Sequence, residues 1–363
     1  MENVIIYIMV GFAVLGGLDR IFGSRIGLGG EFEKGILTSG QLILTMAGIM
    51  VLAPVIADLL VPVVSPVYKL LGADPAIFAG SLLACDMGGA PLAELLAESE
   101  EAAVLGGIIT SSMLGVTISF TIPTAMAMTK KEDSPYVAKG ILCGILTIPI
   151  GIFFGGLTAK ISPLFILKNM IPIIVIALII ALGVWKFEKI TIVIFNAFGK
   201  LISAVAVFGL LIAIIDALTG WRPIENIASI SESLSTIGEI ALMLAGAFPL
   251  VFVLSKLLSK PLVKLGNKLG INEAAALGLI SCTVNSLLVF KTVEDMNERG
   301  KVVNMAFAVS AAFVLGDHLA YTASFSPLAI IPMIVGKLCA GICAVAVAFM
   351  LTRPKAKNTQ KSP

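Results

Sequence analysis

Long runs of hydrophobic residues, separated by short polar segments, follow one another along the whole chain. We distinguish eleven runs, at 4–21, 36–57, 75–97, 102–128, 136–158, 164–185, 190–217, 236–258, 273–290, 302–323 and 327–351. An α-helix needs about 20 apolar residues to cross a bilayer. The pattern therefore predicts an all-α polytopic membrane protein, embedded in a lipid bilayer, with about 9–11 transmembrane segments.

Two of the runs carry residues that interrupt a membrane helix. The third run holds Asp86 at its centre, followed by Gly88, Gly89 and Pro91, and the ninth holds Asn285 between Val284 and Ser286. Glycine and proline free backbone polar groups, which is tolerated at membrane depth only inside protein or beside a water-filled cavity. We expect both runs to form broken, re-entrant hairpins with breaks at these residues.

An internal repeat relates the two halves of the chain. When the sequence is shifted by 198 residues, 15 of the 73 positions from 40 to 112 are identical without any gap. Gly80 then coincides with Gly278, and Ser112 with Ser310. The register holds through hydrophobic runs and loops alike, which favours a duplication over chance similarity.

Positive charge determines which topology is preferred, because lysine and arginine concentrate in cytoplasmic loops. If all eleven runs cross, one side holds 13 basic residues and the other 10. If 75–97 and 273–290 turn back, nine spans remain and the counts become 19 and 4. We therefore predict two re-entrant hairpins, an N-terminus outside the cell and a cytoplasmic C-terminus.

In this topology the second repeat has the opposite orientation in the membrane to the first. Inverted repeats whose broken helices meet near the midplane are typical of secondary transporters. The expected organisation is a first half at 1–160, a linking span at 161–189, an inverted second half at 190–351 and a basic cytoplasmic tail at 352–363.

Composition agrees with a membrane protein and excludes several functions. Hydrophobic residues form 58% of the chain and charged residues 13%, against about 45–50% and about 25% in soluble proteins. The net charge of +2, without a basic run, argues against a nucleic-acid partner. One histidine and five cysteines, all in apolar runs, predict no disulfide scaffold, no metal site, no cofactor and no enzyme.

Ionisable residues inside membrane spans are costly and are candidates for function. Asp86 lies at the break of the first hairpin, where its carboxylate would be a counter-ion for a small cation; the alternative is a cap on the second half-helix. Asn285 lies one position from the repeat equivalent of Asp86. It would bind a hydroxyl or amine, or serve as a hydrogen bond between helices.

Asp317 and His318 form an adjacent acid–imidazole pair inside another apolar run. They predict a proton relay, or a carboxylate oriented by an imidazole, with a self-satisfied buried pair as the alternative. Ser112 and Ser310 are weaker candidates for substrate binding, since a serine in a helix also bonds back to its own backbone.

Two other features within the apolar runs have ordinary explanations. Lys337 is expected to neutralise a helix C-terminus or a buried carboxylate. Gln41 and its repeat mate Glu239 are expected near span ends, in interfacial or hydrogen-bonding roles.

Two carboxylates and one amide near the midplane favour a small, cationic, hydrogen-bonding solute. An anion site would instead use basic residues or half-helix N-termini without a nearby acid. A Na⁺-coupled pump or transporter subunit that uses the same buried aspartates is the alternative. A homo-oligomer is left open by the sequence.

Three strings resemble a known family: FAGSLLACDMGG at 78–89, GKVVNMAFAVSAAFVLGDHLA at 300–320 and PMIVGKL at 332–338. They are similar to the bacterial ethanolamine-utilisation permease family, EutH, over nearly all of 1–351. The resemblance implies import of ethanolamine through the bacterial cytoplasmic membrane. It assigns no site residues, so the candidates above rest on the residues alone.

Overall fold

The computed structural model describes residues 2–352, and within this range the chain is helical and has no β-strand. The predicted basic tail at 352–363 lies outside the described residues, except for Thr352. The all-α fold class predicted from the sequence is confirmed.

The bounds of the elements in the first half of the chain are α1 (Glu2–Ile21), α2 (Leu28–Leu42), η1 (Ile43–Ala47), α3 (Gly48–Leu70), α4 (Ala76–Leu82), η2 (Cys85–Met87), α5 (Gly89–Leu96), α6 (Glu100–Ala103), η3 (Val104–Gly115), η4 (Thr117–Thr121), α7 (Ile122–Met128), α8 (Ser134–Ile145) and α9 (Ile148–Thr158). The elements η1, η3 and η4 are π-helical, and η2 is a 3₁₀ turn.

The remaining elements are α10 (Pro163–Lys186), α11 (Glu188–Thr219), α12 (Ile230–Leu269), α13 (Glu273–Val284), α14 (Ser286–Thr292), η5 (Val293–Asp295), α15 (Glu298–Ala311), α16 (Asp317–Phe325), η6 (Pro327–Ala329) and α17 (Ile330–Leu351). The elements η5 and η6 are 3₁₀ turns.

Eight helical segments of the described chain are long and apolar enough to cross a membrane. They account for eight of the nine spans that the charge distribution predicts. The ninth, at 302–323, is not one continuous helix: α15 ends at Ala311 and α16 begins at Asp317. The expectation of an unbroken span there is wrong, and the break has a structural role described below.

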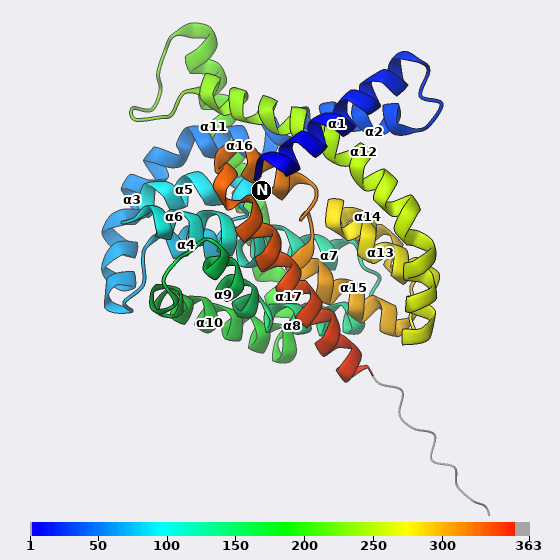
Figure 1. Cartoon of the computed structure of the whole chain (residues 1–363). Helices are drawn as coiled ribbons and strands as arrows, with labels where there is room; N and C mark the ends of the chain where they lie inside the picture. The colour runs from blue at the N-terminus through cyan, green and yellow to red at the C-terminus, as the bar shows by residue number, and fades with distance from the viewer. Residues whose placement is uncertain (1, 353–363) are drawn as a thin grey trace, which may run out of the picture.

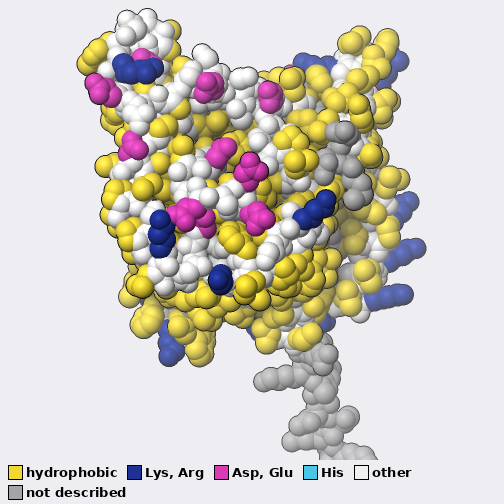
Figure 2. All heavy atoms as spheres, turned by 60° about the vertical axis from the view of Figure 1, so that its left-hand side comes forward, with side chains coloured by type: hydrophobic (Ala, Val, Ile, Leu, Met, Phe, Trp, Pro, Cys, Tyr) yellow, Lys and Arg dark blue, Asp and Glu magenta, His cyan; other side chains and the backbone are white. Residues whose placement is uncertain are grey.

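The outer surface suits a lipid environment. Large hydrophobic side chains such as Leu167 on α10 and Val193 on α11 are more than half exposed. Figure 2 shows hydrophobic side chains along the lower edge and the sides of the molecule, with acidic and some basic side chains across the middle and upper part of the view. Exposed apolar area of this extent is unfavourable in water and favourable in lipid.

Both predicted hairpins are present as pairs of short helices with a break between them. α4 packs against α5, and α13 packs against α14. At the first break Leu83 is extended and Gly88 has φ of 88°. At the second, Asn285 alone is extended. The sequence therefore located both breaks correctly.

The helix boundaries agree in spacing with the proposed duplication. α4 begins at 76 and α13 at 273, α5 at 89 and α14 at 286, and α6 at 100 and α15 at 298. These starts differ by 197, 197 and 198 residues, close to the shift found in the sequence. The opposite orientation of the two halves stays a proposal.

Two groups of helices surround the hairpins (Figure 1). α1, α2 and α12 pack against one another, and α3 packs against α11. The second group contains α8, α9, α15 and α17. Gly246 allows α12 to approach α1 closely, because a Cβ there would lie 2.0 Å from the Met9 carbonyl oxygen. The hairpins lie between these groups, α4–α5 against η3 and α13–α14 beside α12 and α7.

Asp74 fixes the start of the first hairpin. Its carboxylate accepts hydrogen bonds from the backbone N–H of Ala76 at 2.9 Å and of Glu98 at 3.1 Å, and its own N–H donates to Asn169 at 2.7 Å. The carboxylate thus joins the two ends of the hairpin.

We expect Asp74→Ala to lower the free energy of unfolding by about 1–2 kcal/mol, because the backbone N–H groups of Ala76 and Glu98 lose their acceptor. Thermal unfolding in detergent would measure this loss. Asp74→Asn keeps one acceptor oxygen and should lose less. Equal stability of the alanine variant and the wild type would contradict this role.

Candidate functional site

Four of the six predicted substrate-binding residues line one cavity of about 180 Å³. They are Asp86, Asn285, Asp317 and His318. The wall is completed by polar side chains of α2 and η1 and by aromatic rings: Thr38, Gln41, Thr45, Phe120, Phe248 and Phe313. Both hairpins, the long helix α12 and the broken segment before α16 therefore meet at this cavity.

Asp86 lies in the 3₁₀ turn between α4 and α5. The N-cap position of α5 is occupied by Gly88, and no side chain caps that helix, so the capping alternative for Asp86 does not hold. A side chain at position 88 would meet Ile49, 2.2 Å from a Cβ, so glycine is required for both conformation and space. The turn leaves the carboxylate facing the cavity, with 15% of the side chain exposed.

Asn285 lies at the corresponding break of the second hairpin. Its Oδ1 accepts a hydrogen bond from the N–H of Leu287 at 2.9 Å and so caps α14. Capping, the alternative role that the sequence left open for Asp86, is thus performed by Asn285 in the second hairpin. The side chain still lines the cavity, and the amide Nδ2 donates no hydrogen bond to another described residue.

The break between α15 and α16 is held by the end of α13. The N–H of Phe313 donates to the carbonyl of Cys282 at 3.1 Å, and the N–H of Leu315 donates to that of Thr283 at 2.8 Å. Backbone groups freed by the break thus find partners within the protein, as a membrane interior requires. α16 then begins at Asp317, which places that carboxylate and His318 at the cavity.

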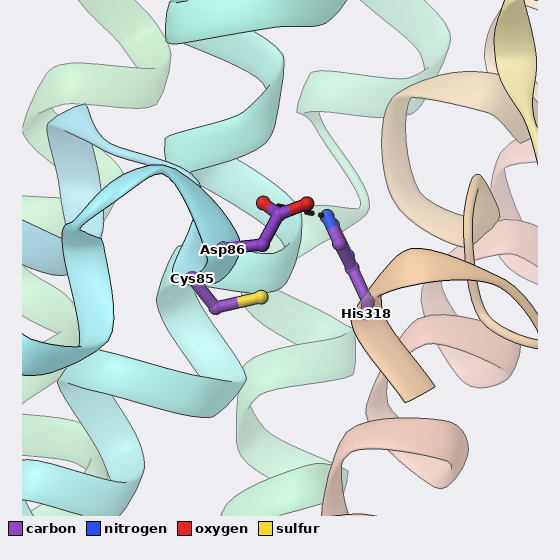
Figure 3. Close-up of side chains that lie close together, drawn as sticks. All are labelled: Cys85, Asp86 and His318. Carbon is purple, nitrogen blue, oxygen red and sulfur yellow. Dashed lines mark ion pairs between the residues drawn. The ribbon is translucent and has the colours of Figure 1, made fainter. Parts of the chain in front are cut away.

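The imidazole of His318 faces Asp86 and not its neighbour Asp317. Its Nε2 lies 3.7 Å from Oδ1 of Asp86, within ion-pair range but longer than a hydrogen bond. Figure 3 shows the two side chains pointing toward each other, Asp86 from the first hairpin and His318 from α16. The predicted acid–imidazole pair between adjacent residues is therefore wrong, because α16 directs consecutive side chains differently.

Lys337 stands behind this histidine. Its side chain is fully buried, and Nζ lies 3.1 Å from Nδ1 of His318 and donates a short hydrogen bond to the carbonyl oxygen of Ser112. The expected partner, a helix terminus or a carboxylate, is not the one found. The position of Lys337 in the middle of an apolar run indicated that its charge has a partner inside the protein. The sequence did not indicate that this partner is His318.

Aromatic rings form one side of the cavity. The ring centroids of Phe120 and Phe313 lie 5.7 Å apart, and those of Phe313 and His318 lie 5.1 Å apart. The face of an aromatic ring attracts a cation within about 6 Å. Phe313 adopts φ of 64°, so the bend before α16 brings its ring into this position. Gln41, expected at a span end, lines the cavity too.

The two serines do not line the cavity. Both are fully buried, Ser112 in η3 and Ser310 in α15. The hydroxyl of Ser112 donates to the carbonyl of Ile109 at 3.1 Å, which matches the backbone-bonding alternative. The hydroxyl of Ser310 has no hydrogen-bond partner among the described residues. The two other residues expected at the first break belong to the first turn of α5. Gly89 is its first residue and packs against the Leu83 carbonyl and Ser111, and Pro91 is its third residue.

Cys85 also lies beside Asp86 and His318. The sulfur, a carboxylate oxygen and an imidazole nitrogen lie within 4.8 Å of one another (Figure 3), a set that could hold a metal ion. Sequence spacing did not indicate this proximity. Nζ of Lys337 lies 3.1 Å from Nδ1 of His318. When protonated, this amine opposes a divalent ion and donates to Nδ1, which leaves the imidazole proton on Nε2 and no lone pair there for a metal. We therefore treat these residues as part of a substrate site.

An all-helical membrane protein whose broken helices meet at a polar cavity has the features of a secondary transporter. The family model "Ethanolamine utilisation protein, EutH" matches residues 1–351. The chain therefore belongs to the EutH family, as the three sequence strings predicted, and is a multi-pass bacterial membrane protein of the permease class.

Relatives cover nearly the whole chain. It is 51% identical over 362 residues to a protein of Listeria monocytogenes named "Probable ethanolamine permease EutH", covering 99% of this chain and 97% of that protein. An Escherichia coli protein of the same name is 41% identical over 397 residues, covering 99% and 97%. A Bacillus subtilis protein, "Uncharacterized protein YxeR", is 40% identical over 361 residues, covering 99% and 98%. No solved structure matches the chain.

Proposed function

We propose that this chain imports ethanolamine across the bacterial cytoplasmic membrane. The two hairpins would expose the cavity to each side of the membrane in turn, as a uniporter or with a linked proton. The observation that carries this proposal is the meeting of Asp86, Asp317 and Asn285 at one small cavity. Ethanolamine offers an ammonium and a hydroxyl, and the cavity offers a partner for each.

The ammonium would lie between the two carboxylates. Asp86 and Asp317 come from opposite halves of the sequence and line the same cavity. Phe120 and Phe313 would add attraction for the cation through their ring faces. The membrane potential favours entry of one positive charge by about 2.3 kcal/mol per 100 mV, so a uniporter already concentrates the substrate.

The hydroxyl would accept a hydrogen bond from Asn285. The Oδ1 atom of this residue is used by the N–H of Leu287, which leaves the Nδ2 group as the donor toward the cavity. The cap also fixes the orientation of the amide, so its donor group is held ready before the substrate arrives.

The proposed orientation has the N-terminus outside and the C-terminus in the cytoplasm. The exposed residues Glu98, Glu100 and Glu101 would then lie outside, and the basic loops of the second half inside. An excess of lysine and arginine on the cytoplasmic side supports this orientation.

Uptake of radiolabelled ethanolamine into proteoliposomes at slightly acid pH tests the function. We expect saturable uptake that is driven by an inside-negative potential and does not need Na⁺. Uptake that requires a Na⁺ gradient would favour the Na⁺-coupled transporter. No uptake under any gradient would refute the proposal.

Asn285→Ala should raise KM for ethanolamine roughly 5–10-fold, because one hydrogen bond is worth about 1–1.5 kcal/mol. Ethylamine, which lacks the hydroxyl, should compete as well in the variant as in the wild type. Asn285→Ser keeps an N-cap oxygen but removes the amide, so it separates the two roles. An unchanged KM in both variants would contradict the assignment.

A further inference from the structure

The charges around the cavity do not balance. Asp86 and Asp317 are the only carboxylates among the described residues that line it, and Asn285, Gln41 and the threonines are neutral. Lys337 does not line the cavity but lies directly behind His318. With both carboxylates ionised, the imidazole of His318 neutral and Lys337 protonated, the side chains of these four residues have a net charge of about −1.

The lysine is fixed in place on two sides. Nζ is held by Nδ1 of His318 at 3.1 Å and by the Ser112 carbonyl, and no part of the side chain is exposed. When Lys337 is protonated, Nζ has only donors, so Nδ1 accepts and the imidazole carries its proton on Nε2, the nitrogen that lies 3.7 Å from Asp86. Lys337 therefore acts on Asp86 through an oriented imidazole, without touching the substrate.

We infer that Lys337 determines which substrates the site accepts by their charge. Its positive charge neutralises one of the two carboxylate charges, so the site binds a substrate with one positive charge, a monoamine, and rejects a diamine. This inference rests on the proposed function and deepens it. A second ammonium would enter a buried site that has no remaining negative charge to neutralise it, and an unpaired buried charge is strongly unfavourable. Lys337 is a positioning and specificity residue in this scheme.

The natural probe is 1,2-diaminoethane, which replaces the hydroxyl of ethanolamine by an amine at the same chain length. At slightly acid pH both of its amines are protonated in water. In the wild type we expect it to inhibit ethanolamine uptake at least about 10-fold more weakly than unlabelled ethanolamine does, because of the uncompensated charge. Equal inhibition by the two compounds would overturn the inference without any variant.

Lys337→Met removes the charge and keeps an unbranched side chain, one atom shorter than lysine. The site would then hold two negative charges, and 1,2-diaminoethane should inhibit within about twofold of ethanolamine. The control is Lys200→Met, since Lys200 also lies within a membrane helix, α11, but is exposed; it should discriminate like the wild type.

A double variant distinguishes charge from structure. Lys337→Met with Asp317→Asn restores one net negative charge and should again reject the diamine, whereas a purely structural lysine would not be compensated by removing a carboxylate. If Lys337→Met folds and still rejects the diamine, the inference is wrong. If it does not fold, equal inhibition of the wild type by the two compounds would still overturn the inference. Wild-type protein that fails to transport ethanolamine would refute the proposed function, whereas ethanolamine transport without discrimination would refute only this inference.

Discussion

Asp86→Asn is expected to reduce ethanolamine uptake at least about 30-fold. Removing one partner of a buried charge pair costs about 2–5 kcal/mol, and the asparagine is nearly isosteric, so the loss falls on charge and not on packing. Asp86 lies at the break of the first hairpin and faces His318 at 3.7 Å. The substitution therefore removes both the proposed counter-ion of the ammonium and the partner of the imidazole.

Initial rates in proteoliposomes would measure this effect, with the amount of folded protein determined by size-exclusion chromatography. Asp216→Asn is the matched control, because Asp216 also lies on a membrane helix but pairs with Arg222 at the surface, at 3.1 Å. The control should transport at the wild-type rate. Wild-type uptake by folded Asp86→Asn would mean that this carboxylate is structural.

Gly316→Ala should strongly impair both folding and transport. A Cβ at position 316 would lie 2.1 Å from the carbonyl oxygen of Val284, which is backbone and cannot move aside. Forced overpacking typically costs about 1–3 kcal/mol and occasionally more. Any relief must separate the tip of the second hairpin from the start of α16, and this displaces Asn285 from Asp317.

Thermal unfolding in detergent and initial uptake rates would measure the two effects. Gly238→Ala is the control, because nothing lies within 4 Å of a Cβ at that position in α12. Alanine is more favourable than glycine in a helix by about 1 kcal/mol, so the control should be as stable as the wild type or more so. A Gly316→Ala variant with normal stability and transport would show that the contact is not needed.

The sequence predicted the elements of the site well because the membrane imposes strong local rules. A polar residue inside an apolar run is costly in a membrane helix and therefore indicates a break or a function. Asp86 and Gly88 mark the break of the first hairpin, and Asn285 marks the break of the second. The repeat and the distribution of lysine and arginine indicated that these breaks belong to hairpins. Each of these signals lies in one stretch of chain, or in a comparison of two stretches.

The break at 312–316 was not predicted. The run at 302–323 is apolar, and its one glycine, Gly316, is unremarkable in a membrane helix. What stops the helix is a pair of backbone hydrogen bonds to Cys282 and Thr283, about 30 residues earlier in the chain. Such partners exist only once α13 has packed beside the segment.

The sequence by itself determined the all-α membrane fold, the two broken hairpins and four of the residues that line the cavity, because hydropathy, helix breakers and buried charge are local properties. Only the tertiary structure decided how those residues pair. His318 faces Asp86 and Lys337, because the 3₁₀ turn of the first hairpin and α17 both pack against α16, which follows that turn by more than 200 residues. Distances between side chains depend on helix packing, which the order of residues along one segment does not contain.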